Sequence, residues 1–436
     1  MNYLALGSSN GLTVLQGAGM AAPYRGAIYA PKAASDELVE DAIDVALEGS
    51  DAQLLAALKD LENKFSQARA TWRSQHPRMI WLAFSDTAAD AVYLSEVHDG
   101  WIEKLKGTRA AGGLALRLHV VRLNRWEFDA GALATVSNDT GGGANRTLQN
   151  HTDSTSHENW LEWASSQNPA SLPAPITVNL KNTCGSATGE ILLGLYDFLG
   201  DMVNPCYPWL EGEAASGGSA NQASASCSGG YFKPVIWAGA AEAQLLTWNF
   251  STSGGLWRPY RPLIRFGVPN GYSDLCLRIK LLFGSQVVWE GPQCLMSASV
   301  DLQELGALEL PPALVGWSEQ GNLTLGLYGK RAAGGTLNVD YLALVPADSW
   351  MRLVPRGLGL ATNETLQISS RLGNAAINKG GGAMFSDYVI YGGPLLAKPG
   401  LKQRLYVFTK NLAGSAAEID RTSQVSVSIP NWTRTL

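Results

Sequence analysis

Charged side chains are scarce in this sequence: Asp, Glu, Lys and Arg together make up 16% of its 436 residues. The net charge of −5 comes from interspersed residues of both signs, with no basic stripe, so we expect no nucleic-acid partner. Long apolar runs are also lacking, and no segment approaches the roughly 20 apolar residues that a membrane span needs. The stretch before Arg25 has neither the basic nor the apolar region of a signal peptide, so we expect none.

Cysteine is present in a number and spacing that exclude two common uses. The five cysteines are an odd set without a C-x-x-C pair, which excludes a complete disulfide framework in one chain and argues against a zinc site. We expect small, buried, unpaired side chains. They are Cys184, Cys206, Cys227, Cys276 and Cys294.

Catalytic motifs are missing as well. The chain has no G-x-S-x-G, no H-E-x-x-H, no P-loop, and no G-x-G-x-x-G between a strand and a helix. The best carboxylate pair is Glu211 and Glu213, on either side of Gly212, and this pattern favours binding a cation or water over catalysis. We therefore expect a protein that is not an enzyme.

The strongest pattern that is present is a β-hairpin between Asp274 and Gln293. Leu275, Leu277, Ile279, Leu281 and Phe283 fall on every second position, with Arg278 and Lys280 on the alternate face, and Gly284-Ser285 separates this run from a second apolar run. Similar short runs recur about every ten residues between residues 173 and 345, as a β-sandwich or jelly roll requires.

One strong helix is predicted, near residues 51–72. Ser50 or Asp51 can cap it, and an apolar stripe follows at spacings of three and four. The stripe consists of Leu54, Leu58, Leu61, Phe65 and Ala68. With the strands after it, this helix predicts a small α+β sheet-and-helix domain.

The predicted chain is therefore mainly β and has four parts. Residues 1–130 form the N-terminal α+β domain, and residues 131–171 form a linker or long loop with a cluster of His151, Asp153 and His157. The two histidines are candidate metal ligands, but we expect them to be solvated loop residues. Residues 172–347 form a central β-sandwich of the jelly-roll type. Residues 348–436 form a small C-terminal β unit, and whether it packs on the N-terminal domain stays open.

Aromatic residues near predicted loops of the sandwich are candidates for stacking on a glycan, because flat apolar rings suit sugar faces. The alternative is that they are core or subunit-interface residues. The candidates are Trp209, Trp257, Tyr260 and Trp317.

Two resemblances extend these predictions. The sandwich resembles a carbohydrate-binding-module jelly roll in three short stretches: Trp209-Leu210-Glu211-Gly212-Glu213, Cys227-Ser228-Gly229-Gly230-Tyr231, and Leu337-Asn338-Val339-Asp340-Tyr341-Leu342. In such modules, acidic residues of the first and last strands often hold a structural calcium. This resemblance therefore implies calcium ligands at Glu211, Glu213 and Asp340, with oxygen donors that suit the ion.

The N-terminal part resembles the first domain of distal tail proteins of siphophages. The resemblance lies in the helix, in Ala68-Arg69-Ala70-Thr71-Trp72-Arg73, in Gly112-Gly113-Leu114, and in the exit Val121-Arg122-Leu123-Asn124-Arg125-Trp126-Glu127. In that class a small domain forms a ring, and a galectin-like or carbohydrate-module-like sandwich decorates the outside. The separate C-terminal unit departs from this pattern.

The leading hypothesis is a non-enzymatic structural protein of a phage or prophage tail, near the distal tip or baseplate hub. The resemblance implies a hexameric or trimeric ring, contacts with other tail proteins, contact with a host surface glycan, and a place in the virion tail after assembly in the host cytoplasm. Apart from the calcium, no cofactor is expected. The alternatives are a monomeric carbohydrate-binding protein and a capsid decoration protein.

Overall fold

The computed structural model describes most of the chain, in eighteen segments. They are residues 3–8, 11–32, 37–71, 79–85, 92–104, 113–128, 134–136, 146–150, 159–168, 170–198, 209–237, 239–249, 259–308, 323–370, 374–379, 383–385, 388–412 and 421–433. Strands dominate these segments, which confirms the prediction of a mainly β chain. None of the helices in them has the length and apolar character needed to cross a membrane.

The chain forms two compact units, and each is built from more than one segment. Unit 1 contains residues 1–134, 169–174 and 429–436, and unit 2 contains residues 135–168 and 175–428. Of the C-terminal stretch 348–436, only residues 429–436 therefore belong to the N-terminal unit, whereas residues 348–428 belong to unit 2.

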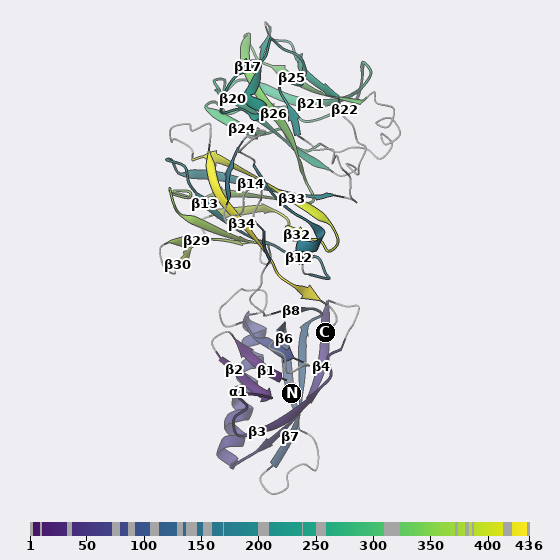
Figure 1. Cartoon of the computed structure of the whole chain (residues 1–436), viewed down its shortest axis with the longest axis vertical. Helices are drawn as coiled ribbons and strands as arrows, with labels where there is room; N and C mark the ends of the chain where they lie inside the picture. The colour runs from purple at the N-terminus through teal and green to yellow at the C-terminus, as the bar shows by residue number, and fades with distance from the viewer. Residues whose placement is uncertain are drawn as a thin grey trace. The chain divides into compact units, whose positions relative to one another are not determined.

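Unit 1 is one curled antiparallel sheet with a helix (Figure 1). Its strands follow the order β2 (Gly11–Gln16), β1 (Tyr3–Ser8), β5 (Trp81–Ser85), β6 (Tyr93–Lys104), β7 (Gly113–Leu123), β4 (Leu38–Glu48) and β3 (Tyr24–Tyr29). Two further short strands, β8 (Trp126–Phe128) and β35 (Trp432–Thr433), pair with each other beside β6.

The predicted helix is confirmed as α1 (Asp51–Thr71). Ser50 begins it through a capping box: the backbone N–H of Gln53 donates to Ser50 Oγ, and Gln53 Oε1 accepts from the Ser50 N–H at 2.9 Å. Leu54, Ala57, Leu61, Phe65 and Ala68 are buried, whereas Leu58 is half-buried. The predicted stripe is therefore confirmed at four of its five positions, and at the remaining one Ala57 is buried while Leu58 packs only partly against the same core.

The C-terminal strand completes unit 1. The carbonyl oxygen of Trp432 accepts hydrogen bonds from the N–H groups of Ser171 and Leu172, at 2.8 and 3.3 Å. The guanidinium of Arg125 lies 3.6 Å from the centroid of the Trp432 ring, which is almost fully buried. A strand paired with a segment hundreds of residues away cannot be placed from local patterns.

Unit 2 contains a sandwich whose strands come from both ends of the unit, which we call the split sandwich (Figure 1). Its first sheet follows the order β10 (Arg146–Gln149), β34 (Thr422–Ile429), β13 (Thr177–Asn182), β28 (Thr365–Ser369), β29 (Asn374–Lys379) and β30 (Ala383–Phe385), with β9 (Ala134–Val136) beside β34. The second follows β11 (Trp160–Trp163), β33 (Lys402–Asn411), β14 (Thr188–Phe198), β27 (Trp350–Pro355) and β31 (Tyr388–Gly392). The short strands β12 (Ala174–Pro175) and β32 (Leu396–Ala397) form a two-stranded sheet.

Residues 209–346 form a second sandwich, inserted between β14 and β27, which we call the inserted sandwich. One sheet follows β17 (Gln222–Ala223), β18 (Tyr231–Trp237), β26 (Gly335–Pro346), β20 (Tyr260–Asn270) and β24 (Val300–Glu304), with β15 (Trp209–Glu211) beside β26. The other follows β16 (Ser216–Gly217), β19 (Ala243–Asn249), β25 (Leu323–Lys330), β21 (Cys276–Phe283) and β22 (Gln286–Glu290), with β23 (Cys294–Leu295) beside β21. Two 3-10 turns, η1 (Ser165–Gln167) and η2 (Ser228–Gly230), complete the described elements of unit 2.

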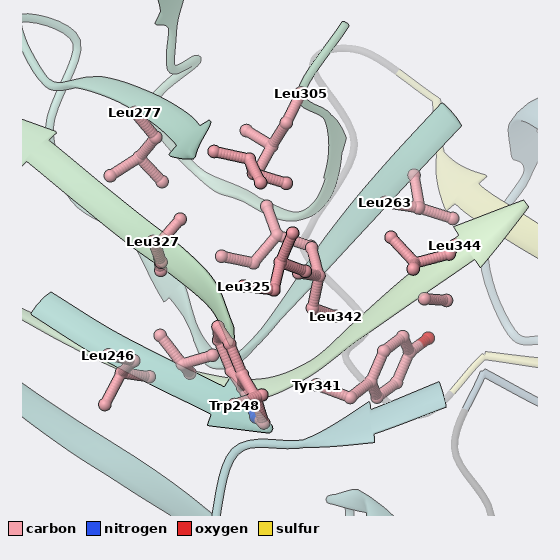
Figure 2. Close-up of a cluster of buried hydrophobic side chains, with 14 of the residues drawn as sticks. Leu246, Trp248, Leu263, Leu277, Leu305, Leu325, Leu327, Tyr341, Leu342 and Leu344 are labelled. Carbon is pink, nitrogen blue, oxygen red and sulfur yellow. The ribbon is translucent and has the colours of Figure 1, made fainter. Parts of the chain in front are cut away.

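A continuous apolar core holds the inserted sandwich together. Figure 2 shows leucines of both sheets pointing toward one another, among them Leu246 and Leu327 from one sheet and Leu263 and Leu342 from the other. The hairpin predicted between Asp274 and Gln293 is confirmed as β21 and β22, joined by Gly284-Ser285 with Gly284 at φ 59°.

The observed organisation differs from the predicted boundaries at 172–347 and 348–436. Strands β13 and β14 belong to the split sandwich and not to the inserted one. The strands of 348–436 form no described sheet by themselves, because every such sheet also contains a strand from residues 126–198. Strands need partners for their backbone groups, and here the partners lie far apart in the sequence.

The cysteine prediction is confirmed in part. Cys184, Cys227, Cys276 and Cys294 form no disulfide with one another, and Cys184 and Cys227 are buried, whereas Cys276 and Cys294 are only half-buried. Cys206 lies outside the described residues, as do His151, Asp153 and His157.

Candidate functional site

The structure brings the three predicted calcium ligands into one neighbourhood of the inserted sandwich. Strand β15 pairs with β26, and the N–H of Gly212 donates to the carbonyl oxygen of Asp340 at 2.6 Å. A Cβ on Gly212 would lie 2.3 Å from the carbonyl oxygen of Val339, so glycine permits this close approach. Glu211 and Glu213 are thereby held beside Asp340.

Glu211 has one satisfied and one unsatisfied carboxyl oxygen. Its Oε1 accepts hydrogen bonds from Trp209 Nε1 at 2.8 Å and Ser228 Oγ at 3.0 Å. Its Oε2 is buried and has no hydrogen-bond partner among the described residues. Burial, and then the negative charges of Glu213 and Asp340, raise the pKa of Glu211 to about 8. At neutral pH this side chain is therefore mainly a neutral acid.

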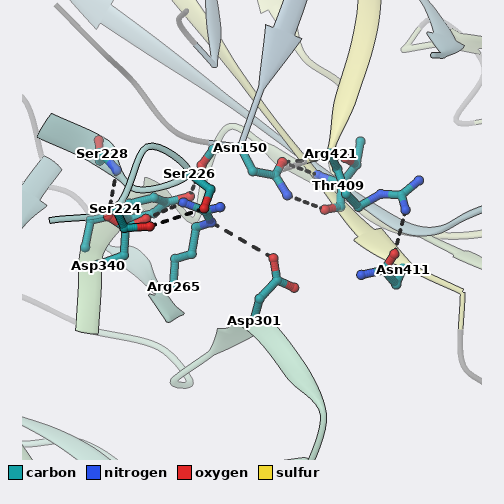
Figure 3. A network of polar contacts seen from close by, with 11 residues as sticks. Asn150, Ser224, Ser226, Ser228, Arg265, Asp301, Asp340, Thr409, Asn411 and Arg421 are labelled. Atoms are coloured by element: carbon teal, nitrogen blue, oxygen red, sulfur yellow. Dashed lines mark hydrogen bonds and ion pairs between the residues drawn. The ribbon is translucent and has the colours of Figure 1, made fainter. Parts of the chain in front are cut away.

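The negative charge of Asp340 is compensated by groups of the protein itself. Its Oδ1 accepts from the N–H of Ser228 at 2.8 Å, and its Oδ2 forms an ion pair with Arg265 (Figure 3). The register between β20 and β26 shifts next to Arg265, and such a bulge re-aims side chains. Arg265 Nε also lies 4.0 Å from Asp301 Oδ2, so one guanidinium lies between two carboxylates.

These contacts do not fit a calcium ion held by Glu211, Glu213 and Asp340. Both carboxylate oxygens of Asp340 already have donors, the N–H of Ser228 and the guanidinium of Arg265. Arg265 thus supplies the positive charge that a calcium ion would otherwise supply to these carboxylates. Among the described residues, no group of three or more His, Cys, Asp or Glu side chains is arranged to hold a metal ion.

The structure describes two of the four aromatic residues that were predicted to stack on a glycan. Tyr260 is 0% exposed, so its prediction is wrong: it begins β20 with its ring in the core. The ring of half-buried Trp209 lies against Tyr341, with centroids 3.9 Å apart, and stacks with Tyr406 and Phe408. The prediction for Trp209 is corrected too, because internal aromatic contacts occupy its ring. Trp257 and Trp317 lie outside the described residues.

Sequence reasoning missed Arg265 and Asp301, the other charged members of this cluster. A signal was available, since Arg265 interrupts the apolar run Pro262-Leu263-Ile264-Arg265-Phe266. A charge inside a strand that is otherwise buried requires a buried partner. That rule predicts an internal ion pair, although it cannot say which of the acidic residues supplies it.

A second candidate site lies in unit 1, where the sheet ends at β2 and β3. Among the described residues no ladder of backbone hydrogen bonds joins these strands, and a side chain links them instead, since the N–H of Ala27 donates to Gln16 Oε1 at 2.9 Å. An open, mostly apolar hollow of about 370 Å³ lies beside this β2–β3 seam. Ile28 is 79% exposed there, and Leu12 on β2 is 43% exposed.

Comparisons with known proteins add two distant similarities. No protein-family model matches the chain, and no curated protein sequence matches it. One solved chain of the phage p2 baseplate, in its activated conformation with Sr, is similar at 10% identity and a TM-score of 0.25, covering 76% of this chain and 99% of that one. A chain of infectious bursal disease virus, Gx strain, is similar at 11% identity and a TM-score of 0.15, covering 68% and 79%. Neither similarity assigns this chain to a family.

Proposed function

We propose that this chain is a non-enzymatic structural component of a phage or prophage tail, of the distal-tail type, that assembles into a ring through unit 1. The observation that carries the proposal is the β2–β3 seam, a sheet boundary with exposed apolar side chains. The resemblance of the N-terminal residues to distal tail proteins supplies the identity of the assembly. The ring, of six or three copies by that resemblance, would be made in the host cytoplasm and reside in the virion tail with other tail proteins.

The seam supports assembly for a physical reason. Strand edges present backbone groups that invite pairing, and natural sheets usually protect them with charge, proline or a covering element. Here Ile28, on the edge strand β3, is almost fully exposed beside an apolar hollow. A second copy of this chain that covers Ile28 and Leu12 would remove this apolar surface from water, which is the main driving force of association. A ring needs two different contact surfaces on each copy, and the seam supplies one.

By the resemblance to distal tail proteins, a sandwich decorates the outside of such an assembly, and we propose the inserted sandwich for this part. It enters and leaves the split sandwich within unit 2, so the proposed ring surface in unit 1 does not depend on its strands. We propose that host-glycan contact belongs to unit 2.

The test is the mass of the full-length protein by light scattering, with negative-stain imaging of the main peak. We expect closed rings, and we expect Ile28→Lys to shift the protein toward monomer because a charge would be buried in the contact. Leu358→Lys is the matched control, since Leu358 is 80% exposed in unit 2. Loss of rings in both variants, or in neither, would overturn the role of the seam. A wild-type monomer would count against the ring itself and favour a monomeric carbohydrate-binding protein, whereas a ring-free oligomer that binds capsid would favour a decoration protein.

A further inference from the structure

A pocket in unit 2 combines two guanidinium groups with aromatic rings. It has a volume of about 600 Å³ and lies where the start of β20 meets β27 and β31. Its lining residues are Arg261, Trp350, Arg352, Val354, Tyr391 and Gly392. A volume of roughly 300–1,000 Å³ is usual for sites that bind small molecules.

Strand geometry explains why these side chains meet. Trp350, Arg352 and Val354 alternate along β27 and therefore share one face, while Met351 and Leu353 point to the opposite side and are buried. Tyr391 lies opposite Arg352 in the ladder between β27 and β31, so it joins the same face. Position 392 requires glycine: at φ 98°, a Cβ would lie 2.3 Å from the Trp350 carbonyl oxygen.

Arg261 and Arg352 are held in place by ion pairs, but both side chains remain partly exposed to solvent. The guanidinium of Arg261 lies 3.7 Å from the centroid of the Trp350 ring, and its Nη1 pairs with Glu304. Arg352 forms ion pairs with Glu190, through Nε, and with Glu304, at 3.7 Å from Nη1. The side chains of Arg261 and Arg352 are still 31% and 36% exposed.

The charges around the pocket do not cancel. Lys410 Nζ also pairs with Glu190, at 2.9 Å. The connected ion pairs therefore contain three cations (Arg261, Arg352 and Lys410) and two carboxylates (Glu190 and Glu304). Both arginines line the opening with partly exposed side chains, so their guanidinium groups stay accessible to an anion while they pair with Glu190 and Glu304.

We propose that this pocket binds an acidic sugar, a saccharide ring carrying a carboxylate or a phosphate. The planar guanidinium groups suit two oxygens of such an anion, and the fixed position of Arg261 on Trp350 reduces the entropy lost on binding. Tyr391, which is 51% exposed, supplies an aromatic face for the sugar ring beside the anion. This inference goes beyond the tail proposal and does not depend on it, because a chain that forms no ring can still bind the sugar.

The experiment is calorimetric titration of the full-length protein at low salt with glucuronate, glucose 6-phosphate, glucose and inorganic phosphate. We expect at least one of the two acidic sugars to bind at least about tenfold more tightly than glucose and inorganic phosphate, a difference of about 1.4 kcal/mol. Binding of glucuronate alone would identify a carboxylate site, and binding of glucose 6-phosphate alone a phosphate site. No binding of either acidic sugar at millimolar concentration would overturn the proposal.

Two variants test separately the contact with the anionic group and the contact with the sugar ring. Arg352→Gln should weaken the acidic sugar at least about tenfold, and Tyr391→Ala should weaken it toward the level of inorganic phosphate. Arg25→Gln is the matched control, since Arg25 in unit 1 is 53% exposed and pairs with Glu48. If Arg352→Gln fails to fold, Tyr391→Ala decides, because its side chain projects into solvent. Unchanged binding in Tyr391→Ala would overturn the sugar assignment, and an equal loss in Arg25→Gln would show an unspecific charge effect and overturn the site.

Discussion

The side chains of Arg265 and Asp340 form an ion pair from which solvent is excluded, and each is 0% exposed. They lie on the neighbouring strands β20 and β26 of the inserted sandwich, with Asp301 near the other side of the guanidinium (Figure 3). Burial raises the pKa of Asp301 although Arg265 acts in the opposite direction. The pair therefore stabilises the fold only while both partners are present.

Removing the charge of Asp340 should be costly. Asp340→Asn leaves the Arg265 guanidinium buried with reduced compensation, and breaking a buried pair in this way costs about 3–5 kcal/mol. Urea unfolding followed by circular dichroism measures the loss. Asp274→Asn is the matched control, because Asp274 pairs with Arg331 in the same sandwich but is 49% exposed. Equal losses in the two variants would contradict the importance of burial.

The pKa of Glu211 predicts that stability falls as pH rises. The folded state holds the proton up to a pH of about 8, whereas the ordinary pKa is 4.5. The contribution of Glu211 is therefore fully present below about pH 4.5 and is lost as pH rises through 8. Its size is on the order of a few kcal/mol.

Thermal unfolding of the wild type and of Glu211→Gln at pH 5 and pH 8 tests this. The amide mimics the protonated acid, so the variant should lose less stability than the wild type between the two pH values. Glu213→Gln should have a smaller effect in the same direction, since it removes one of the charges that raise the pKa of Glu211. If calcium stabilised the wild type at pH 8 but not Glu211→Gln, the calcium prediction would be restored.

Gly100 allows α1 to approach β6 in unit 1. A Cβ at Gly100 would lie 2.2 Å from the ring of Phe65, which is almost fully buried. Gly100→Ala should therefore destabilise unit 1 by about 1–3 kcal/mol through overpacking. The control is Gly11→Ala on β2, where a Cβ meets nothing within 4 Å. Adding Phe65→Leu to Gly100→Ala should recover part of the loss, and no recovery would point to backbone strain in place of the ring contact.

Local patterns predicted the local elements of this fold. The alternation from Leu275 to Leu281 identified β21, and the stripe from Leu54 to Ala68 identified α1, because each pattern has the period of its element. Pairing between distant segments could not be predicted in this way. The partner of β8 is β35, at the other end of the chain, and nothing in Trp432-Thr433 alone names that partner.

The sites were predictable to a smaller extent. The resemblance brought together Glu211, Glu213 and Asp340, which do lie near one another, but it could not show that Arg265 compensates Asp340. Tyr260 was misplaced because a tyrosine beside a loop can face either side of its strand. Arg261 and Arg352 are 91 positions apart in the sequence and meet at one pocket through the return of β27 to the split sandwich.

His119 provides a pH-dependent contact on unit 1. Its ring stacks on Trp101, with centroids 4.6 Å apart, and its two nitrogens lie 2.9 Å from Glu40 and 3.1 Å from Glu103. Partial burial lowers the pKa of His119, but the hydrogen bonds to Glu103 and Glu40 outweigh it and the pKa is raised. Asp44, on β4, adds to the negative charge nearby, and Arg117, on β7, pairs with it.

A raised pKa means that the charged imidazole stabilises the folded unit. This contribution is fully present below the ordinary value of 6.5 and is lost as pH rises through the folded pKa. NMR titration of the imidazole protons, with His119→Gln to assign the signal, should give a pKa above 6.5. Glu40→Gln and Glu103→Gln should each lower it, because each replaces a negatively charged acceptor with a neutral one. Val39→Ala is the control: Val39 lies on β4 next to Glu40 but on the buried face of that strand, so this substitution should leave the pKa of His119 unchanged. A wild-type pKa at or below 6.5 would show that burial outweighs the two carboxylates.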